Sequence, residues 1–410
     1  MDAITFRLDN NVKAIYEQSK NSEVTHCGII INSGSRDEKE NQLGLAHFIE
    51  HTIFKGTSKR KSFHILSSID KVGGEINAYT TKEQICIYTS TLKEDFERSL
   101  DLLSDICFNS IFPEKEIAKE KEVILDEINS YLDSPSEQIF DDFEDLLFKN
   151  HALGHNILGT EESVKNVTRN DILEFIAEHF TSENIVFSYV GPEKLEKVKK
   201  KVNKYFNQKI SHEKRIERKL FSAYQPFTEN KQNSQFQSHL LLGNMAYPKN
   251  HPKRPALILL NNLIGGPAMN SRLNLNIREK YGFTYNLESN YVSYSDAGWF
   301  GIYMGTDKKY LDKTLNLCLK ELKKIRENAL GVKQLYYAKK QILGQLAISG
   351  ENNLSQMLSN GKNHAANNKI YTKKEVEKII EDLTAQDLLE VANEIFEPSQ
   401  ISYLSFYPQN

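Results

Sequence analysis

The chain has 410 residues, 39% of them hydrophobic and 26% charged, which is the composition of an ordinary globular protein and enough length for two domains of roughly 200 residues. The formal net charge of -3 offers no basic field for nucleic acid or for an anionic membrane surface, so neither is expected as a partner. The most apolar stretch, residues 256–264, contains two asparagines and is far too short to span a bilayer.

The N-terminal residues and the cysteines favour a reducing compartment. The first residues carry an acidic side chain at Asp2 and no apolar core segment, so we expect no signal peptide. The four cysteines lack paired spacing, and three of them, Cys27, Cys86 and Cys107, lie in apolar runs where buried free thiols are expected. A cytoplasmic location fits these features best.

The first 91 residues alternate between strand patterns and two short helix patterns. The first two strands flank Asp9-Asn10-Asn11, which is typical of a hairpin turn. Gly73-Gly74 ends the second helix, and alternating strands follow. The predicted strands cover residues 4–8, 12–16, 25–31, 75–80 and 84–91, and the predicted helices cover residues 45–54 and 62–72.

From residue 92 onward the periodicity becomes helical. Apolar residues recur at spacings of three and four at Phe96, Leu100, Leu103 and Ile106, which predicts an amphipathic helix. Later helices are predicted at residues 114–132, 136–148 and 169–180, and a strand at residues 185–190. Residues 207–234 are polar and weakly periodic, which is typical of a linker.

Beyond the linker the pattern of the first half restarts. Residues 87–93 and 302–308 each form a strand that runs into an amphipathic helix, and the closing strand at 401–407 corresponds to the strand at 185–190. This parallel predicts two copies of one domain.

The expected fold class is therefore α+β, with two tandem homologous domains. The first domain covers residues 1–206 and the second covers residues 235–410. Each is expected to contain a mainly antiparallel sheet packed with a layer of helices.

The first domain contains the pattern H-x-x-E-H, formed by His47, Glu50 and His51. Positions three and four apart share one helix face, so both imidazoles can point at one metal ion. A carboxylate on that face can accept a proton from water that the metal activates, as in zinc hydrolases. The alternative is a surface helix that happens to carry two histidines.

Two histidines leave a catalytic zinc site one protein ligand short. His151 and His155 also have helical spacing, but they flank a glycine in a loop-like setting and no carboxylate lies between them, so we treat them as incidental. The acidic helix at residues 114–132 is the better source, because Glu120 and Glu127 lie on one half-apolar face. Its other glutamates are expected to form a solvated surface.

Several segments closely resemble the pitrilysin/insulinase family of inverted-motif zinc peptidases. They are GLAHFIEHTIFKGT, GGEINAYTTKEQ, EKEVILDEINSYLDSP and HALGHNILGTEESV, and the resemblance continues into the second half of the chain. The short-chain branch of the family, which includes the mitochondrial processing peptidase, is nearest in length.

The resemblance implies a complete zinc site. In the family the third ligand is a glutamate on a later helix, which corresponds to Glu127, and a second glutamate that supports the site corresponds to Glu120. One Zn²⁺ per chain is therefore expected, with His47, His51 and Glu127 as ligands and Glu50 as the base.

The second half supplies a further family feature within RLNLNIREKYGFTYNLES. Arg278 and Tyr285 correspond to an arginine–tyrosine pair thought to act on the substrate carbonyl, and both side chains are good donors to a developing oxyanion. Without the resemblance, a surface arginine and a packed tyrosine would be expected. Gly265-Gly266 corresponds to a family loop, although Pro267-Ala268 replaces its usual small residues.

The resemblance also implies where the substrate binds. In relatives the strand at residues 75–80 pairs with the backbone of an extended peptide, a role that falls here on Asn77 and Ala78. Phe54 is expected to help line the pocket beyond the scissile bond. An ordinary strand with Ala78 in the core is the alternative.

These features predict a zinc endopeptidase or oligopeptidase that hydrolyses unfolded peptides inside a closed chamber made by two chains. One alternative is a non-catalytic scaffold of the same fold, but such subunits lose zinc or base residues. The other is a peptide-binding subunit that depends on a partner chain. In the heterodimeric members of this branch of the family, one chain has the zinc motif and the other has the Arg–Tyr pair. Both features occur in the present chain, which favours a homodimer.

Overall fold

The computed structural model describes residues 3–212, 217–233 and 236–408, so residues 213–216 and 234 of the predicted linker lie outside it. The chain forms two compact units, each assembled from three segments. The first unit comprises Met1–Asn129, His155–Arg218 and Ile348–Thr372. The second unit comprises Ser130–Gly154, Lys219–Ala347 and Lys373–Asn410.

The first unit contains a six-stranded sheet with the order β1-β2-β6-β3-β5-β4. All neighbouring strands run antiparallel except β2 and β6, and β1 and β2 form the predicted hairpin. The strands are β1 (Ile4–Arg7), β2 (Lys13–Gln18), β3 (Val24–Ile31), β4 (Glu75–Thr80), β5 (Ile85–Leu92) and β6 (Ile185–Gly191).

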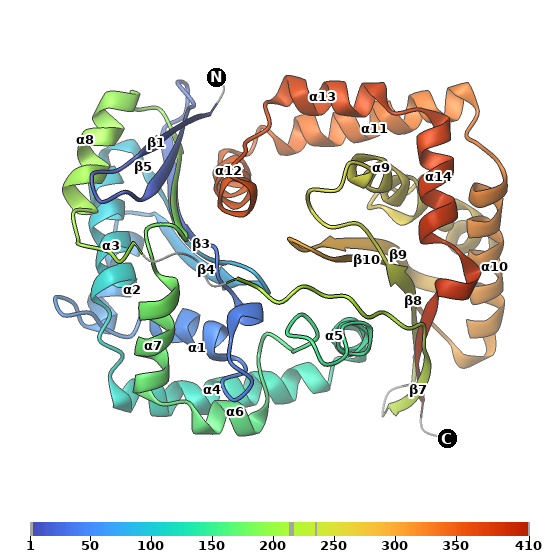
Figure 1. Cartoon of the computed structure of the whole chain (residues 1–410), viewed down its shortest axis with the longest axis horizontal. Coiled ribbons are helices and arrows are strands. Elements are labelled where there is room, and N and C mark those ends of the chain that lie inside the picture. Colours follow the sequence, from blue (N-terminus) through green and yellow to red (C-terminus); the bar gives the residue numbers. More distant parts are fainter. Residues whose placement is uncertain (1–2, 213–216, 234–235, 409–410) are drawn as a thin grey trace. The chain divides into compact units, whose positions relative to one another are not determined.

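Helices cover both faces of this sheet, because its central strands are apolar on both sides (Figure 1). Successive side chains in a strand point to opposite faces, so Ile29 and Ile31 join the main core while Ile30 joins a smaller cluster with Ala365. The helices of this unit are α1 (Leu45–Thr52), α2 (Ser62–Asp70), α3 (Phe96–Asn109), most of α4 (Glu114–Leu132), α6 (Glu161–Asn166), α7 (Arg169–His179), α8 (Leu195–Tyr205) and α12 (Asn353–Asn367).

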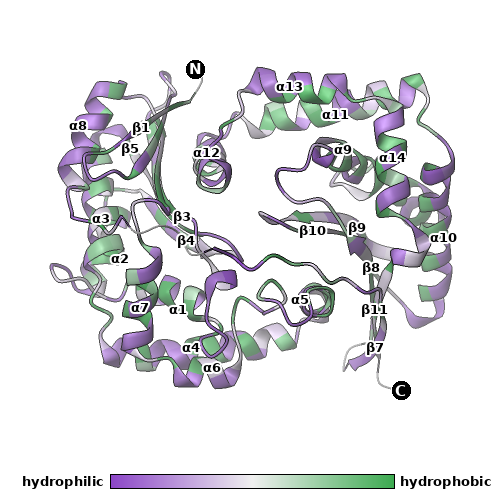
Figure 2. Cartoon of the chain, in the orientation of Figure 1, coloured by the Kyte–Doolittle hydropathy of each residue, from purple (hydrophilic) through white to green (hydrophobic). Residues whose placement is uncertain are grey.

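The second unit contains a five-stranded sheet with the order β7-β11-β8-β10-β9, in which only β7 and β11 run parallel. Its strands are β7 (Thr228–Asn233), β8 (Ser238–Met245), β9 (Thr284–Ser293), β10 (Gly298–Thr306) and β11 (Ser402–Pro408). Its helices are α5 (Pro135–Leu147), α9 (Arg254–Gly265), α10 (Lys308–Glu327), most of α11 (Val332–Ser349), α13 (Lys373–Asp382) and α14 (Ala385–Ile395). In Figure 2 helices such as α10 and α14 carry both hydrophilic and hydrophobic segments, as expected for helices with one buried side.

The two sheets repeat one topology. Without β1, the order β2-β6-β3-β5-β4 of the first sheet corresponds position by position to the order of the second, and the parallel pair occupies the same place. This confirms the predicted pair of tandem α+β domains. The last residues of the predicted linker form β7, whose polar and exposed sequence gives little strand signal because it pairs only at the edge of the sheet.

Each half of the sequence contributes one helix to the unit built mainly from the other half. Helix α5 precedes the predicted linker but packs on β8 and β11, with Phe143 beside Trp299. Helix α12 follows the linker but packs on β3 and β6, where Asn32 donates to the Ala365 carbonyl at 2.6 Å. A β-carbon at Gly361 would lie 2.4 Å from Ile30 Cδ1, so any larger residue there would force the Ile30 side chain to shift.

All four cysteines are buried and none forms a disulfide among the described residues, as expected for three of them from their apolar surroundings. Across the described ranges, no helix combines the length and the apolarity needed to cross a membrane.

Candidate metal centre

The helix that carries the H-x-x-E-H pattern begins after a residue whose backbone conformation and close packing favour glycine. Gly44 precedes α1 with φ of 85°, a conformation that side chains with a β-carbon rarely adopt. A β-carbon there would also lie 2.5 Å from the Leu158 carbonyl oxygen. Glu38 accepts hydrogen bonds from the Gly44 and Ala46 amides at 2.8 and 2.7 Å, which satisfies two N–H groups at the start of the helix.

One face of α1 anchors the helix in the core and the other carries the polar residues. Leu45, Phe48 and Ile49 are fully buried in the main cluster of the first unit. His47 and His51 share the remaining face, with ring centroids 4.5 Å apart. His47 is only 8% exposed, so its imidazole is held where few orientations are open to it.

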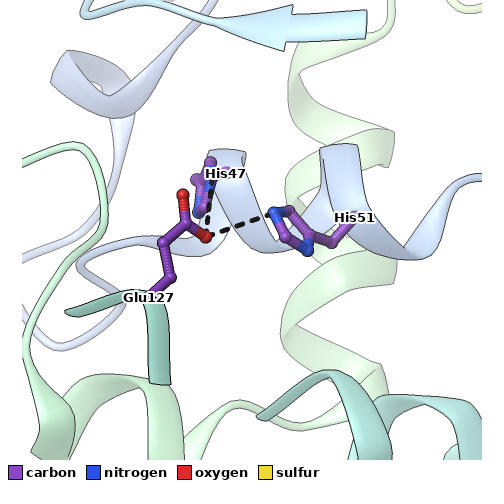
Figure 3. A group of neighbouring side chains, drawn as sticks. All are labelled: His47, His51 and Glu127. Atoms are coloured by element: carbon purple, nitrogen blue, oxygen red, sulfur yellow. Dashed lines mark ion pairs between the residues drawn. The ribbon is translucent and has the colours of Figure 1, made fainter. Parts of the chain in front are cut away.

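Helix α4 brings Glu127 to both histidines (Figure 3). Its Oε2 lies 3.8 Å from His47 Nε2 and 3.5 Å from His51 Nε2, and the three potential ligand atoms lie within 4.8 Å of one another. Ligand atoms about 2.0–2.2 Å from a tetrahedral zinc ion are roughly 3.3–3.6 Å apart. The donor set therefore has the composition and nearly the spacing of a zinc site.

The hydrogen bonding of His47 also indicates that a cation belongs here. Its Nδ1 is buried without a hydrogen-bond partner among the described residues, and its Nε2 is too far from Glu127 for a hydrogen bond. A buried imidazole nitrogen without a partner is costly, and a cation held between Nε2 and the carboxylate offsets part of that cost. The residues present thus fit a metal ion.

Burial adjusts the protonation of the residues on α1. It lowers the pKa of His47 to about 4, and the neighbouring His51 imidazole acts in the same direction. A neutral imidazole is the form that binds a metal. Burial raises the pKa of Glu50 above its usual range, and hydrogen bonding from Thr80 opposes this shift. A raised carboxyl pKa is what a general base near neutral pH requires.

Glu120 lies on the far side of His51 from Glu127. Its Oε2 is 3.3 Å from His51 Nδ1, and its Oε1 is 2.6 Å from the Lys55 ammonium. The sequence prediction included Glu120 but missed Lys55. The only sequence signal for Lys55 is its spacing of four from His51, which is the spacing of residues that share one face of a helix. Glu38 was missed as well, because only the fold brings it to the start of α1.

The predicted substrate strand, β4, lies at the edge of the first sheet beside α1. Asn77 is exposed and Ala78 is half-buried against the core. The Ala78 amide donates to the Asn77 side chain at 2.8 Å. Phe54 is half-buried and packs against the main cluster. These positions are compatible with peptide binding along β4.

Arg278 and Tyr285 belong to the second unit, where they line one cavity of about 580 Å³ together with Gly265 and Gly266. Arg278 lies in a π-helical segment (Asn274–Glu279), a conformation frequent at functional sites. Tyr285 is 80% exposed, and neither side chain has a hydrogen bond or ion pair within the described part of the chain. Both donors are therefore free to bind a ligand.

His151 and His155 do not form a metal site among the described residues. The Nε2 of His151 is 3.0 Å from the Lys219 carbonyl, and its Nδ1 accepts from the Leu153 amide at 3.2 Å. Because both ring nitrogens are occupied by the backbone, His151 has a structural role, in agreement with its treatment as incidental.

Comparisons with known proteins agree with the fold. Residues 13–161 match the family model described as insulinase (peptidase family M16), and residues 166–342 match the model of the peptidase M16 inactive domain. An uncharacterized zinc protease, YmxG of Bacillus subtilis (strain 168), is 33% identical over 93% of this chain and 92% of its own length. The beta subunit of the mitochondrial-processing peptidase of Saccharomyces cerevisiae is 26% identical over 95% of this chain and 87% of its own.

A solved structure shows the same fold. The peptidase M16 inactive domain from Pseudomonas fluorescens superimposes with a TM-score of 0.92 at 18% identity, covering 100% of this chain and 98% of that one. Because the family matches run through both halves of the sequence, the chain belongs to the insulinase family, peptidase family M16.

Proposed function

We propose that this protein is a zinc metalloendopeptidase that hydrolyses unfolded peptides. The observation that supports it most is the convergence of His47, His51 and Glu127 from α1 and α4, with Glu50 on the same helix as the histidines. A purely structural helix pair has no need of two imidazoles and a carboxylate at this spacing. Relatives named zinc proteases support the same chemistry.

His47, His51 and Glu127 would hold one zinc ion per chain through the two Nε2 atoms and a carboxylate oxygen. When bound, zinc supplies Lewis acidity toward the scissile carbonyl and lowers the pKa of water. Glu50 accepts a proton from the attacking water and passes it to the departing amine. Its raised pKa brings it closer to the range in which both transfers are efficient.

The remaining predicted residues serve the substrate. The free edge of β4 would add an extended peptide as a further strand, a mode that excludes folded proteins. Arg278 and Tyr285, with unpaired donors, would stabilise the oxyanion of the tetrahedral intermediate. We propose a homodimer that encloses this reaction in a chamber, since a single chain carries both the zinc motif and the Arg–Tyr pair.

Peptide cleavage by the purified chain tests the proposal. We expect about one zinc per chain by elemental analysis, and cleavage of unstructured insulin-sized peptides that a chelator abolishes and zinc restores. A folded protein rich in the same cleavage sites should be spared. His47→Ala and His51→Ala should lose most of the zinc.

Wild-type zinc content in both histidine variants would refute the metal assignment. Equal cutting of folded and unfolded substrates would refute the chamber and the edge-strand mode. As a control, alanine at His151, whose ring nitrogens lie against the Lys219 carbonyl and the Leu153 amide, should leave the zinc content unchanged.

A further inference from the structure

Lys55 and Glu120 form a tight ion pair directly beside His51. The Lys55 ammonium lies 2.6 Å from Glu120 Oε1, and the two side chains are 27% and 7% exposed. The other oxygen of the same carboxylate lies 3.3 Å from His51 Nδ1. Glu120 is therefore placed between a cation and an imidazole.

His51 lies between two carboxylates, one at each ring nitrogen. Glu120 is at Nδ1, and Glu127 is 3.5 Å from Nε2. A neutral imidazole has a single N–H hydrogen, which goes to the nitrogen with the better placed acceptor. Only the tautomer with hydrogen on Nδ1 leaves the Nε2 lone pair free for a metal. Metal binding therefore requires that Glu120 be a better acceptor for this hydrogen than Glu127.

Lys55 decides whether Glu120 is in position to accept that hydrogen. Among the described residues Lys55 is the only cationic side chain that pairs with Glu120. A nearly buried carboxylate without a cation is costly, so its removal would drive Glu120 toward solvent. The Nδ1 hydrogen would then lose its acceptor, and the tautomer with Nε2–H directed at Glu127 would be favoured.

We propose that Lys55 is a positioning residue: by holding Glu120 against Nδ1 it keeps His51 in the tautomer whose Nε2 can bind the metal. The inference rests on the proposed zinc site. It differs from an ordinary ion pair, which would contribute little to stability when partly exposed and would leave the metal affinity of the folded chain unchanged.

The test measures zinc affinity of the full chain after zinc removal, by competition with a chromophoric chelator. Lys55→Met should weaken zinc binding by about 10-fold, the lower end of the effect of residues that orient ligands. Lys55→Arg keeps a cation and should restore affinity to near the wild-type value. Lys165→Met, which removes an exposed ion pair with Glu161 in the same unit, is the matched control and should have no effect.

Two further measurements separate positioning from simple stabilisation. In the zinc-free chain, ¹⁵N shifts of the His51 imidazole should report hydrogen on Nδ1 in the wild type and on Nε2 in Lys55→Met. The double variant Lys55→Met/Glu120→Gln should bind zinc as Glu120→Gln does, because Lys55 acts only through Glu120. Lys55→Gln replaces the methionine variant if that chain does not fold.

Equal zinc affinity in Lys55→Met and Lys165→Met, with unchanged ¹⁵N shifts, would overturn the role of Lys55. Additive losses in the double variant would do the same. A wild-type chain that binds no zinc would refute the proposed function instead, and the ¹⁵N measurement on the zinc-free chain would still decide which tautomer Lys55 imposes.

Discussion

The carboxylates around the two histidines have different neighbours, and these determine what each can do. Glu127 faces both Nε2 atoms, Glu120 is paired with Lys55, and Glu50 is half-buried, with a pKa that burial raises and hydrogen bonding from Thr80 opposes. In the proposed site the ligand, the orienting residue and the base therefore differ in their environment and not in residue type.

Glu50→Gln separates metal binding from catalysis. The amide has the size of the carboxylate but cannot accept the proton, so we expect a normal zinc content and a loss of nearly all turnover, on the order of 100-fold or more. Elemental analysis and peptide cleavage on the same preparation measure both. Near wild-type turnover would place the base elsewhere, with Glu120 as the next candidate.

The lowered pKa of His47 predicts a pH dependence of stability in the zinc-free chain. Between pH 6.5 and about 4 the unfolded state binds a proton at this residue and the folded state does not, so stability falls as the pH falls through this window. The contribution is on the order of 1–3 kcal/mol. Urea unfolding at pH 7 and pH 4.5 measures it, and His47→Gln should show a smaller difference. Identical pH dependence in both chains would contradict the prediction.

At the scale of single elements, the start of α1 determines where both histidines lie. Gly44→Ala combines an unfavourable φ with a contact of 2.5 Å to the Leu158 carbonyl. We expect a loss of about 1–3 kcal/mol of stability together with weaker zinc binding. Gly73→Ala is the matched control, because Gly73 has φ of 70° and open space around it.

The control should lose stability from backbone strain alone and keep its zinc affinity. Denaturant unfolding and chelator competition on both variants distinguish the two effects. Equal zinc affinity in Gly44→Ala and Gly73→Ala would show that the start of α1 does not position the metal ligands.

The edge strand β4 offers a second test at this scale. Ala78→Pro removes an amide hydrogen that bonds to the Asn77 side chain, and an edge strand such as β4 is where a sheet tolerates proline best. Because one backbone hydrogen bond to the peptide is lost, kcat/KM should fall by about 10-fold, equivalent to ~1–1.5 kcal/mol. Zinc content should not change, and Ala78→Ser serves as the control. Unchanged cleavage would place the peptide elsewhere.

At the scale of the whole molecule, the proposed homodimer predicts that each zinc site takes Arg278 and Tyr285 from the partner subunit. Homodimers of Glu50→Gln and of Arg278→Ala/Tyr285→Phe should each be nearly inactive. Mixing equal amounts with subunit exchange should give about half mixed dimers with one intact site of two, hence roughly a quarter of wild-type activity.

A mass tag on one variant confirms that subunits exchange. Mixed dimers without any recovered activity would show that each zinc site uses the Arg–Tyr pair of its own chain, since every site would then lack either its base or its donors.

The sequence by itself determined the features that depend on local spacing. The motif at His47, Glu50 and His51 and the acidic face with Glu120 and Glu127 follow from helical periodicity over a few turns. The restarting pattern after the linker predicted two homologous domains, and the strand orders confirm it. Periodicity did not choose between Glu120 and Glu127 as the ligand; the family resemblance did so.

Only the tertiary structure decided the contacts between residues far apart in the chain. Helices α5 and α12 each belong to the unit built mainly from the other half of the sequence, which depends on the sheet face that each helix covers. Helical periodicity predicts the apolar side of a helix but not the sheet against which that side packs. Lys55 beside Glu120, and Glu38 at the start of α1, are likewise products of packing. The role of a charged side chain depends on the groups that the fold places beside it, because burial and distance set the strength of each electrostatic interaction.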